Sequence, residues 1–269
     1  MAYNGYKVYD GHAHIFPDKI AHKAAESIGA FYGYDMHHRG RAGRLELIRV
    51  ECGVEGVLVS SVATSPEQVT HINDFMVQQK ALYPHFITLG SMHPDFAGYE
   101  KELERIKALG LYGVKLHSDF QKFDIDDPKM DKVYAKIVEL GLPVLFHMGD
   151  KRFNYSHPAR LARVLEKFPD MVCTAAHFGG WSVWEDVPES LAGSNCYFDT
   201  SSTLEFLDDY TLPIRLLEKF GADRFMFGTD YPMWDFRECF DNFMKLPLDD
   251  AQREKIFYKN FERLYGLDK

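Results

Sequence analysis

The chain has 269 residues, a length that fits one large domain or two small ones. Apolar residues make up 46% of it, enough for a sizeable core, and the net charge of −9 disfavours a surface for nucleic acid or anionic membrane. The N-terminal residues lack the apolar stretch of a signal peptide, and no run reaches membrane-spanning length, so we predict a cytoplasmic protein.

The four cysteines are scattered, and none forms a Cys-x-x-Cys pair. This spacing disfavours a thiolate zinc site and agrees with reduced thiols in the cytoplasm. We therefore look for function in other side chains.

Eight short apolar runs rich in β-forming residues recur along the chain and predict eight strands. They are Tyr6–Asp10, Val54–Ser61, Phe86–Met92, Gly113–His117, Pro143–His147, Met171–His177, Cys196–Thr200 and Arg224–Asp230.

Stretches with helical periodicity lie between these runs. They are Gly98–Leu109, Asp127 to Leu140, His157 to about Pro169, and Leu204–Phe220, which Gly221 ends. Residues 28–44 are predicted as an elaborated loop after the first strand.

Strand and helix in alternation predict a parallel sheet with helices outside it. Eight such units favour a (β/α)8 TIM barrel, as a single domain over residues 1–269. An open doubly wound sheet is the alternative, disfavoured because no Gly-x-Gly-x-x-Gly loop follows a strand.

Side chains of metal-ligand type stand at the ends of several predicted strands. His12 and His14 are two residues apart, so a strand would point both the same way, and His147, His177 and Asp230 each close a later apolar run. A single such histidine is often structural, and an aspartate after Gly-Thr is often a turn or a cap. Their recurrence at strand ends, where barrel active sites form, predicts a metal centre that suits zinc.

These motifs resemble those of the amidohydrolase superfamily, in the branch of metal-dependent barrel hydrolases that includes relatives of aminocarboxymuconate semialdehyde decarboxylase. The matching pieces are Asp10-Gly11-His12-Ala13-His14, Gly113-Val114-Lys115-Leu116-His117, the strand ending at His147, Ala176-His177-Phe178-Gly179-Gly180 and Gly228-Thr229-Asp230-Tyr231-Pro232. The resemblance covers nearly the whole chain and is specific for the branch rather than for a substrate.

The resemblance implies that His12, His14, His147 and Asp230 bind one divalent metal, most simply zinc. Asp230 would also be catalytic as the group that moves a proton, and catalytic His177 would polarise a carbonyl or stabilise negative charge. A bound metal would activate water for attack.

Lys115 has two interpretations. In binuclear relatives a lysine on the fourth strand is carboxylated and bridges two metals; the interpretation that we favour is an ammonium that pairs with a carboxylate or binds substrate.

Further substrate contacts are predicted from the loops. They are His117 beside Lys115, the basic residues Arg39 and Arg41, which suit a carboxylated substrate, and the aromatic residues Trp181 and Tyr231, which suit a planar one. Asp119 and Asp199 are predicted to orient ligands from behind.

The primary functional hypothesis is a hydrolase that cleaves an amide, lactone or related bond in a small carboxylated substrate. The alternative is a metal-dependent nonoxidative decarboxylase of a small cyclic or aromatic acid, because the same ligands serve both reactions. A metal-binding barrel without catalysis is a third hypothesis, disfavoured because every residue that the chemistry requires is present. The predicted partner is a small molecule, not nucleic acid or membrane, and the resemblance suggests a homodimer.

Overall fold

The computed structural model describes residues 3–268 and divides the chain into two compact units. Unit 1 comprises Met1–Ser61, Gln79–Ile87 and Thr200–Lys269, and unit 2 comprises Val62–Gln78 and Thr88–Asp199.

Unit 1 contains a parallel sheet in the order β1-β2-β3. The strands of unit 1 are β1 (Tyr9–His14), β2 (Gly56–Ser60), β3 (Phe86–Thr88, whose last residue belongs to unit 2) and β9 (Phe225–Met226), which is not part of that sheet. Its helices are α1 (Asp18–Tyr32), α2 (Ala42–Glu51), α9 (Thr211–Phe220), α10 (Phe236–Met244), α11 (Asp250–Glu254) and α12 (Asn260–Tyr265), with a 3-10 turn η5 (Ala222–Arg224) and a π-helical turn η6 (Lys255–Lys259). Helix α3 (Val69–Leu82) begins in unit 2 and ends in unit 1.

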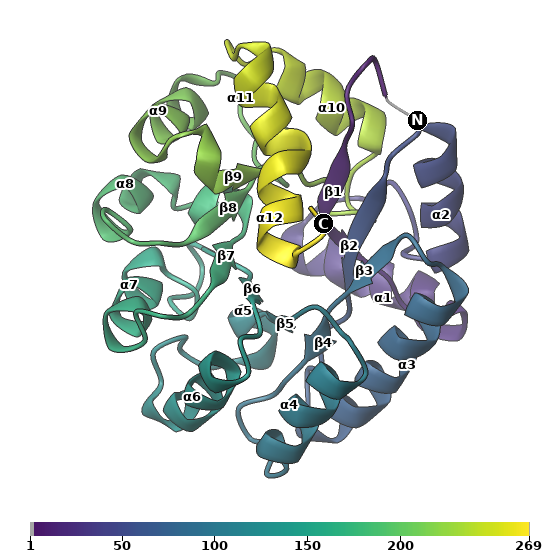
Figure 1. Ribbon diagram of the computed structural model, residues 1–269, viewed down its shortest axis with the longest axis vertical. Coiled ribbons are helices and arrows are strands. Elements are labelled where there is room, and N and C mark those ends of the chain that lie inside the picture. The colour runs from purple at the N-terminus through teal and green to yellow at the C-terminus, as the bar shows by residue number, and fades with distance from the viewer. Residues whose placement is uncertain (1–2, 269) are drawn as a thin grey trace. The chain divides into compact units, whose positions relative to one another are not determined.

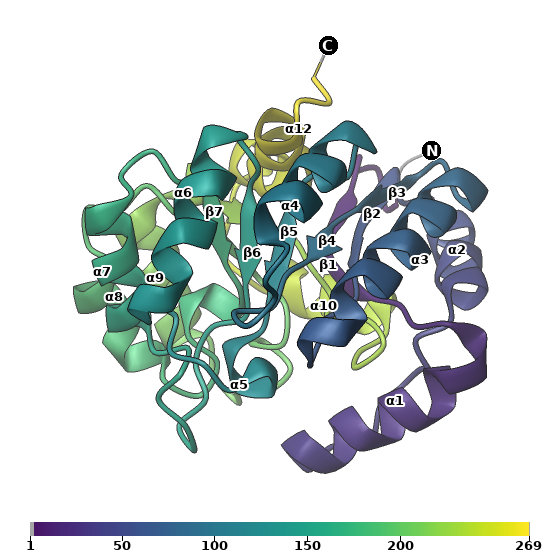
Figure 2. The same ribbon diagram turned by 90° about the horizontal axis from the view of Figure 1, so that it is seen from below.

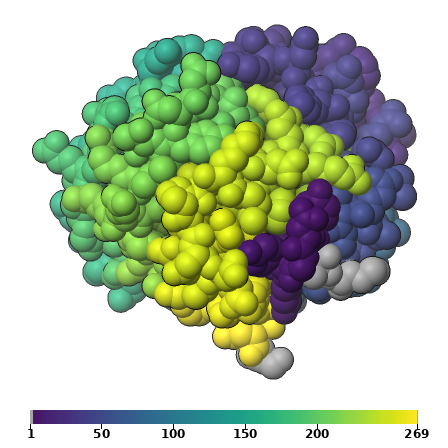
Figure 3. Space-filling model, turned by 90° about the horizontal axis from the view of Figure 1, so that it is seen from above, coloured from purple at the N-terminus to yellow at the C-terminus, as the bar shows by residue number. Residues whose placement is uncertain are grey.

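Within unit 1, the segment that leads into β1 packs against the C-terminal helices. Figure 3 shows the N-terminal segment, in purple, against the C-terminal helices, in yellow. The Tyr6 hydroxyl donates to Asp250 over 2.6 Å, and the Tyr9 ring stacks on Phe261 at 4.7 Å. These contacts anchor the start of β1, the strand that carries two predicted ligands.

In unit 2, strands alternate with helices, and neighbouring strands pair in parallel. The strands are β4 (Gly90–Ser91), β5 (Val114–Leu116), β6 (Val144–Phe146), β7 (Cys173–Ala175) and β8 (Tyr197–Asp199). The helices are α4 (Tyr99–Ala108), α5 (Ser118–Gln121), α6 (Asp131–Glu139), α7 (Pro158–Lys167) and α8 (Val187–Ser190), with 3-10 turns η1 (Pro66–Gln68), η2 (Pro128–Met130), η3 (His177–Gly179) and η4 (Trp184–Asp186). Figure 1 shows these strands in succession, with α4, α6 and α7 outside them. Because strands β5, β6 and β7 are wholly buried, they read as apolar runs rather than as alternating ones.

The first strand lies further along the chain than the predicted Tyr6–Asp10. Its pairing with β2 starts at Tyr9 opposite Gly56 and continues to His14 opposite Ser60, with a register shift between Asp10 and Ala13. Pairing partners, which sequence alone does not reveal, therefore place both histidines inside the strand. The third predicted strand, Phe86–Met92, is divided into β3 and β4.

Two predicted helix and loop boundaries were also wrong. Helix α1 occupies part of the predicted loop and ends at Tyr32. Gly33 follows it with a φ of 73°, in the left-handed region that glycine adopts freely. Helix α9 starts at Thr211 rather than at Leu204, and Pro213 explains why: proline lacks the N–H that a helix interior needs but is tolerated in a first turn.

Among the described residues, none of the helices combines the length and the apolar character needed to cross a membrane. The four cysteines are buried free thiols.

Candidate metal centre

His12 and His14 on β1 direct the same ring nitrogen toward each other. Their Nε2 atoms lie 3.1 Å apart, and their ring planes cross at 67°. The lone pair of an imidazole nitrogen lies in the ring plane, so two crossed planes allow both lone pairs to meet at one ion. His12 is fully buried and the His14 side chain is 16% exposed, which leaves one side of the pair accessible.

Asp230 joins this pair from the loop after β9. Its backbone N–H donates to the His12 carbonyl over 2.8 Å, and the His14 N–H donates to the Tyr231 carbonyl over 2.6 Å. The Asp230 Oδ1 atom consequently lies 3.2 Å from Nε2 of His14 and 3.7 Å from Nε2 of His12. Asp230 has a φ of 60°, a conformation that costs an L-residue energy and that often marks a functional site.

The spacing of these three atoms fits a divalent ion. Four ligand atoms about 2.0–2.1 Å from a tetrahedral zinc would stand roughly 3.3 Å from one another. The three observed separations of 3.1, 3.2 and 3.7 Å bracket that value. The first and last predicted strands thus bring His12, His14 and Asp230 together as the sequence predicts.

Serine hydroxyls hold the remaining polar atoms of the three ligands. Ser201 Oγ lies 3.1 Å from Nδ1 of His12, and Ser60 Oγ lies 3.1 Å from Nδ1 of His14. Ser202 Oγ donates to Oδ2 of Asp230 over 2.6 Å. Sequence reasoning missed all three serines; the only available signal was their place just after or at the end of predicted strands.

Asp10 has a structural task in the same region. Its carboxylate accepts hydrogen bonds from the backbone N–H groups of His12, at 3.1 Å, and Thr229, at 3.0 Å, and from the Thr229 hydroxyl, at 2.6 Å. The first residue of the Asp-x-His-x-His motif therefore joins β1 to the segment that carries Asp230.

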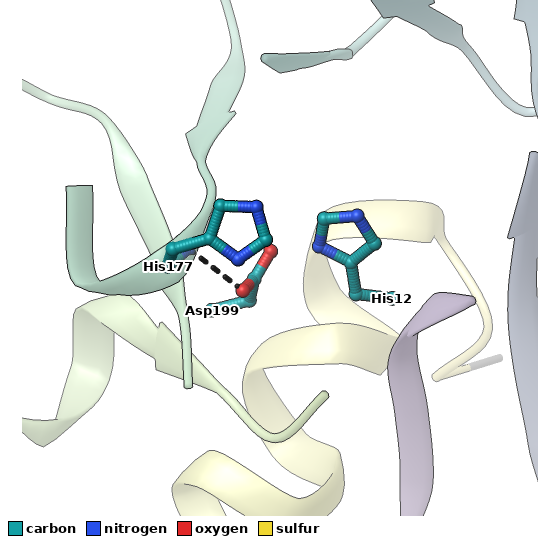
Figure 4. A group of neighbouring side chains, drawn as sticks. All are labelled: His12, His177 and Asp199. Atoms are coloured by element: carbon teal, nitrogen blue, oxygen red, sulfur yellow. Dashed lines mark hydrogen bonds between the residues drawn. The ribbon is translucent and has the colours of Figure 1, made fainter. Parts of the chain in front are cut away.

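Within unit 2, His147 and His177 also face each other. Nδ1 of His147 lies 3.0 Å from Nε2 of His177, and the rings cross at 64°. The His177 N–H donates to Asp199 over 3.0 Å, a bond drawn in Figure 4. His177 has a φ of 60°, so Asp199 helps to hold a strained backbone conformation; the role of Asp199 in orienting a metal ligand stays a prediction.

His117, Asp119 and His147 form a second group of potential ligands. His117 and Asp119 follow β5, where α5 begins (Figure 2), and His147 follows β6. The rings of His117 and His147 are stacked at 3.9 Å with only 6° between their planes. Parallel planes carry parallel lone pairs, which do not converge on one ion. We therefore do not assign a metal to this trio.

Asp119 is nevertheless unusual. Its side chain is fully buried, Ser156 donates to Oδ2 over 2.5 Å, and Oδ1 has no hydrogen-bond partner among the described residues. Burial raises the pKa of Asp119 to about 7, against the opposing effect of the Ser156 hydrogen bond.

The predicted substrate residues belong to both units, with Lys115, His117 and Trp181 in unit 2 and Arg39, Arg41 and Tyr231 in unit 1. Lys115 is wholly buried in β5, and Trp181 lies 5.9 Å from the Arg152 guanidinium. Tyr231 is also buried, its hydroxyl donates to the Arg41 carbonyl over 3.0 Å, and burial raises the pKa of this hydroxyl. Arg39 is exposed at the edge of a pocket of about 450 Å³ that helix α1 and the segment after it line. A substrate role for these residues and for His117 stays a prediction.

Residues 9–267 match the amidohydrolase family. The chain belongs to that family. The resemblance seen in the sequence is thus confirmed, and the protein is an enzyme of the amidohydrolase superfamily.

Solved structures of similar fold extend the comparison to nearly the full length. An uncharacterised TIM-barrel protein from Bordetella bronchiseptica is 21% identical, covers 97% of this chain and 98% of its own, and has a TM-score of 0.80. A 5-carboxyvanillate decarboxylase from Sphingomonas paucimobilis is 16% identical over 97% and 99% of the two chains, with a TM-score of 0.76. A dihydroxybenzoic acid decarboxylase from Polaromonas with bound manganese is 17% identical over 98% of each chain, with a TM-score of 0.74. This amidohydrolase has the TIM-barrel fold that the sequence predicts.

Proposed function

We propose that the protein is a metal-dependent nonoxidative decarboxylase of a small aromatic carboxylic acid. The observation that carries the proposal is the convergence of His12, His14 and Asp230, with one oxygen of Asp230 facing the two imidazoles and the other held by Ser202. Hydrolysis is the primary hypothesis from sequence, but the similar structures named above include two decarboxylases of phenolic acids, and these favour the alternative.

One divalent ion is proposed, held by His12, His14, His147 and Asp230. Imidazole and carboxylate ligands suit zinc and also accept manganese, and manganese is the ion named with the Polaromonas decarboxylase. When bound, the ion supplies positive charge that holds the substrate carboxylate and an adjacent oxygen.

Asp230 is proposed to move the proton. Decarboxylation breaks the bond between the ring carbon and the carboxylate, carbon dioxide leaves, and the electron pair that remains on the ring carbon must receive a proton. The Ser202 hydroxyl holds Oδ2 of Asp230, which fixes the direction in which the carboxyl group faces. His177 is proposed to stabilise negative charge as the bond breaks.

Aromatic side chains near Ser202 agree with a ring-shaped substrate. The Trp234 indole N–H donates to Ser202 over 3.0 Å, Phe206 meets the Trp234 ring edge-on at 5.3 Å, and Tyr34 meets Phe206 at 4.7 Å. Such a cluster offers apolar faces to a planar molecule.

The cytoplasmic location and the homodimer remain predictions.

The test follows carbon dioxide and water separately. Protein purified without chelator is analysed for metal and incubated with a panel of hydroxybenzoates, and carbon dioxide and the ring product are quantified; lactones and amides are assayed in parallel. We expect about one metal per chain and one carbon dioxide for each acid consumed, without net addition of water. Hydrolysis of a lactone or amide by metal-loaded protein that releases no carbon dioxide would replace decarboxylation with the hydrolase hypothesis.

A further inference from the structure

The oxygen atoms that face Nε2 of His147 indicate which nitrogen of this ring carries the proton. Nε2 lies 3.2 Å from the Gly149 carbonyl oxygen and 3.6 Å from Oδ2 of Asp119. A carbonyl oxygen accepts and never donates, and a carboxylate favours a proton on the nitrogen that faces it. Nε2 therefore carries the hydrogen, and the lone pair of the neutral ring lies on Nδ1.

This arrangement is opposite to that of the histidines in unit 1. There the Nδ1 atoms face serine hydroxyls and the Nε2 atoms face each other. In His147 the atom directed at another functional side chain is Nδ1, 3.0 Å from Nε2 of His177.

Asp119 is held in place from two directions. Ser156 donates to Oδ2, and the backbone N–H of Gly149 donates to the Ser156 carbonyl over 2.9 Å. The short helix α5 is fastened by Gln121, which donates to the carbonyls of Ala63, at 2.8 Å, and Met92, at 2.6 Å. The carboxylate therefore stays beside His147 rather than turning to another partner.

The unpartnered oxygen of Asp119 also needs an explanation. A buried carboxylate with one oxygen lacking a hydrogen bond is costly unless positive charge lies close by. An imidazole that ligates a cation becomes a stronger N–H donor, so a loaded His147 would place positive charge at Nε2, 3.6 Å from Oδ2 of the same carboxyl group.

We propose that Asp119 is a positioning residue that keeps the proton of His147 on Nε2 and so presents Nδ1 as the metal-binding atom. This role rests on the metal of the proposed function, and it involves no contact between Asp119 and substrate.

The first test needs no metal. In metal-free protein with ¹⁵N-labelled histidine, long-range ¹H–¹⁵N correlation spectra report which nitrogen of each ring is protonated, and the His147 signals are assigned by their loss in His147→Gln. We expect the Nε2–H form in the wild type, and a larger share of the Nδ1–H form in Asp119→Ala, where the Gly149 carbonyl alone remains to hold the proton on Nε2. An Nδ1–H form in the wild type would overturn the proposal even if the protein binds no metal.

The second test measures affinity rather than activity. Apoprotein is titrated with Mn²⁺ or Zn²⁺ against a chromophoric chelator. Asp119→Asn should raise the dissociation constant by roughly 10- to 100-fold, the range for loss of a carboxylate behind a histidine ligand. Asp95→Asn is the matched control, because it removes a mostly exposed carboxylate of the same unit; it should stay within about twofold of the wild type.

The positioning role would be wrong if folded Asp119→Asn kept the metal affinity of the wild type and Asp119→Ala kept the same His147 tautomer. If the Asp119 variants do not fold, Ser156→Ala takes their place, with an expected several-fold loss of affinity. Absence of metal from the wild type would refute the proposed function, while the tautomer experiment would still decide the role of Asp119.

Discussion

The pair His12 and His14 of unit 1 differs from the pair His117 and His147 of unit 2 in the angle between the rings and in the charge of the neighbouring groups. In unit 1, His12 and His14 cross at 67°, and neutral serine hydroxyls hold their outer nitrogens. In unit 2, His117 and His147 lie parallel at 6°, and a buried carboxylate stands beside His147. Proximity of ligand-type residues is thus insufficient for a metal site; the planes of the rings decide whether their lone pairs converge.

The largest effect should follow from Asp230→Asn. Asparagine keeps the size of the side chain but cannot accept and return a proton, so turnover should fall roughly a thousandfold. Steady-state decarboxylation assays measure this, and circular dichroism checks the fold. Asp241→Asn, on the exposed side of α10, should keep full turnover. Substantial activity in Asp230→Asn would remove Asp230 from the proton-transfer step.

The contrast between crossed and stacked rings is tested by comparing His14→Ala with His117→Ala. His14→Ala removes one of three converging atoms and should retain less than roughly a tenth of the wild-type metal. His117→Ala should keep about one equivalent, because its ring plane is parallel to that of His147. Elemental analysis measures the metal bound per chain in both variants. Equal loss of metal from the two would contradict the argument from ring planes.

The neutral partners of unit 1 should matter less than the ligands themselves. Ser60→Ala and Ser201→Ala each leave Nδ1 of a ligand histidine without its hydroxyl, which should weaken metal binding about tenfold. Chelator competition measures the affinity. Ser61→Ala is the control, because Ser61 donates to the Ile15 carbonyl instead of to a histidine. If Ser61→Ala weakened binding as much as Ser60→Ala, the loss would reflect packing rather than ring orientation.

The smallest effect concerns the pH dependence of stability. Burial raises the pKa of Glu205 from 4.5 to about 6 in the folded chain. Because folding tightens proton binding, the stability that Glu205 contributes is present below about pH 4.5 and is lost as the pH rises through about 6.

Between pH 4.5 and pH 7, Glu205 should lower the free energy of unfolding of the wild type by about 2 kcal/mol. Glu205→Gln should remove this decrease. Urea denaturation at both pH values provides the measurement. Glu218→Gln, which alters an exposed carboxylate of α9, should leave the wild-type slope unchanged. A slope that Glu205→Gln does not change would show that Glu205 titrates alike in the folded and unfolded chains.

Local sequence was a good guide to the elements and a poorer guide to their limits. Pro158 marked the start of α7 correctly, because proline suits a first helical turn. The same rule, applied to Pro213, would have placed the start of α9 within two residues of Thr211 rather than seven residues before it. The limits of β1 depended on β2, some fifty residues away, and no local pattern reports such pairing.

The sequence by itself determined that His12 and His14 share one side of a strand, because side chains two residues apart on a strand point the same way. It also determined the family, through motifs that span the chain. Only the tertiary structure decided which nitrogen each histidine presents and whether two rings cross or stack. Those features depend on Ser60, Ser201 and Asp119, and Ser60 and Ser201 lie 46 and 189 residues from the histidines that they contact. A local pattern cannot show such contacts, because folding alone brings distant segments within hydrogen-bonding range.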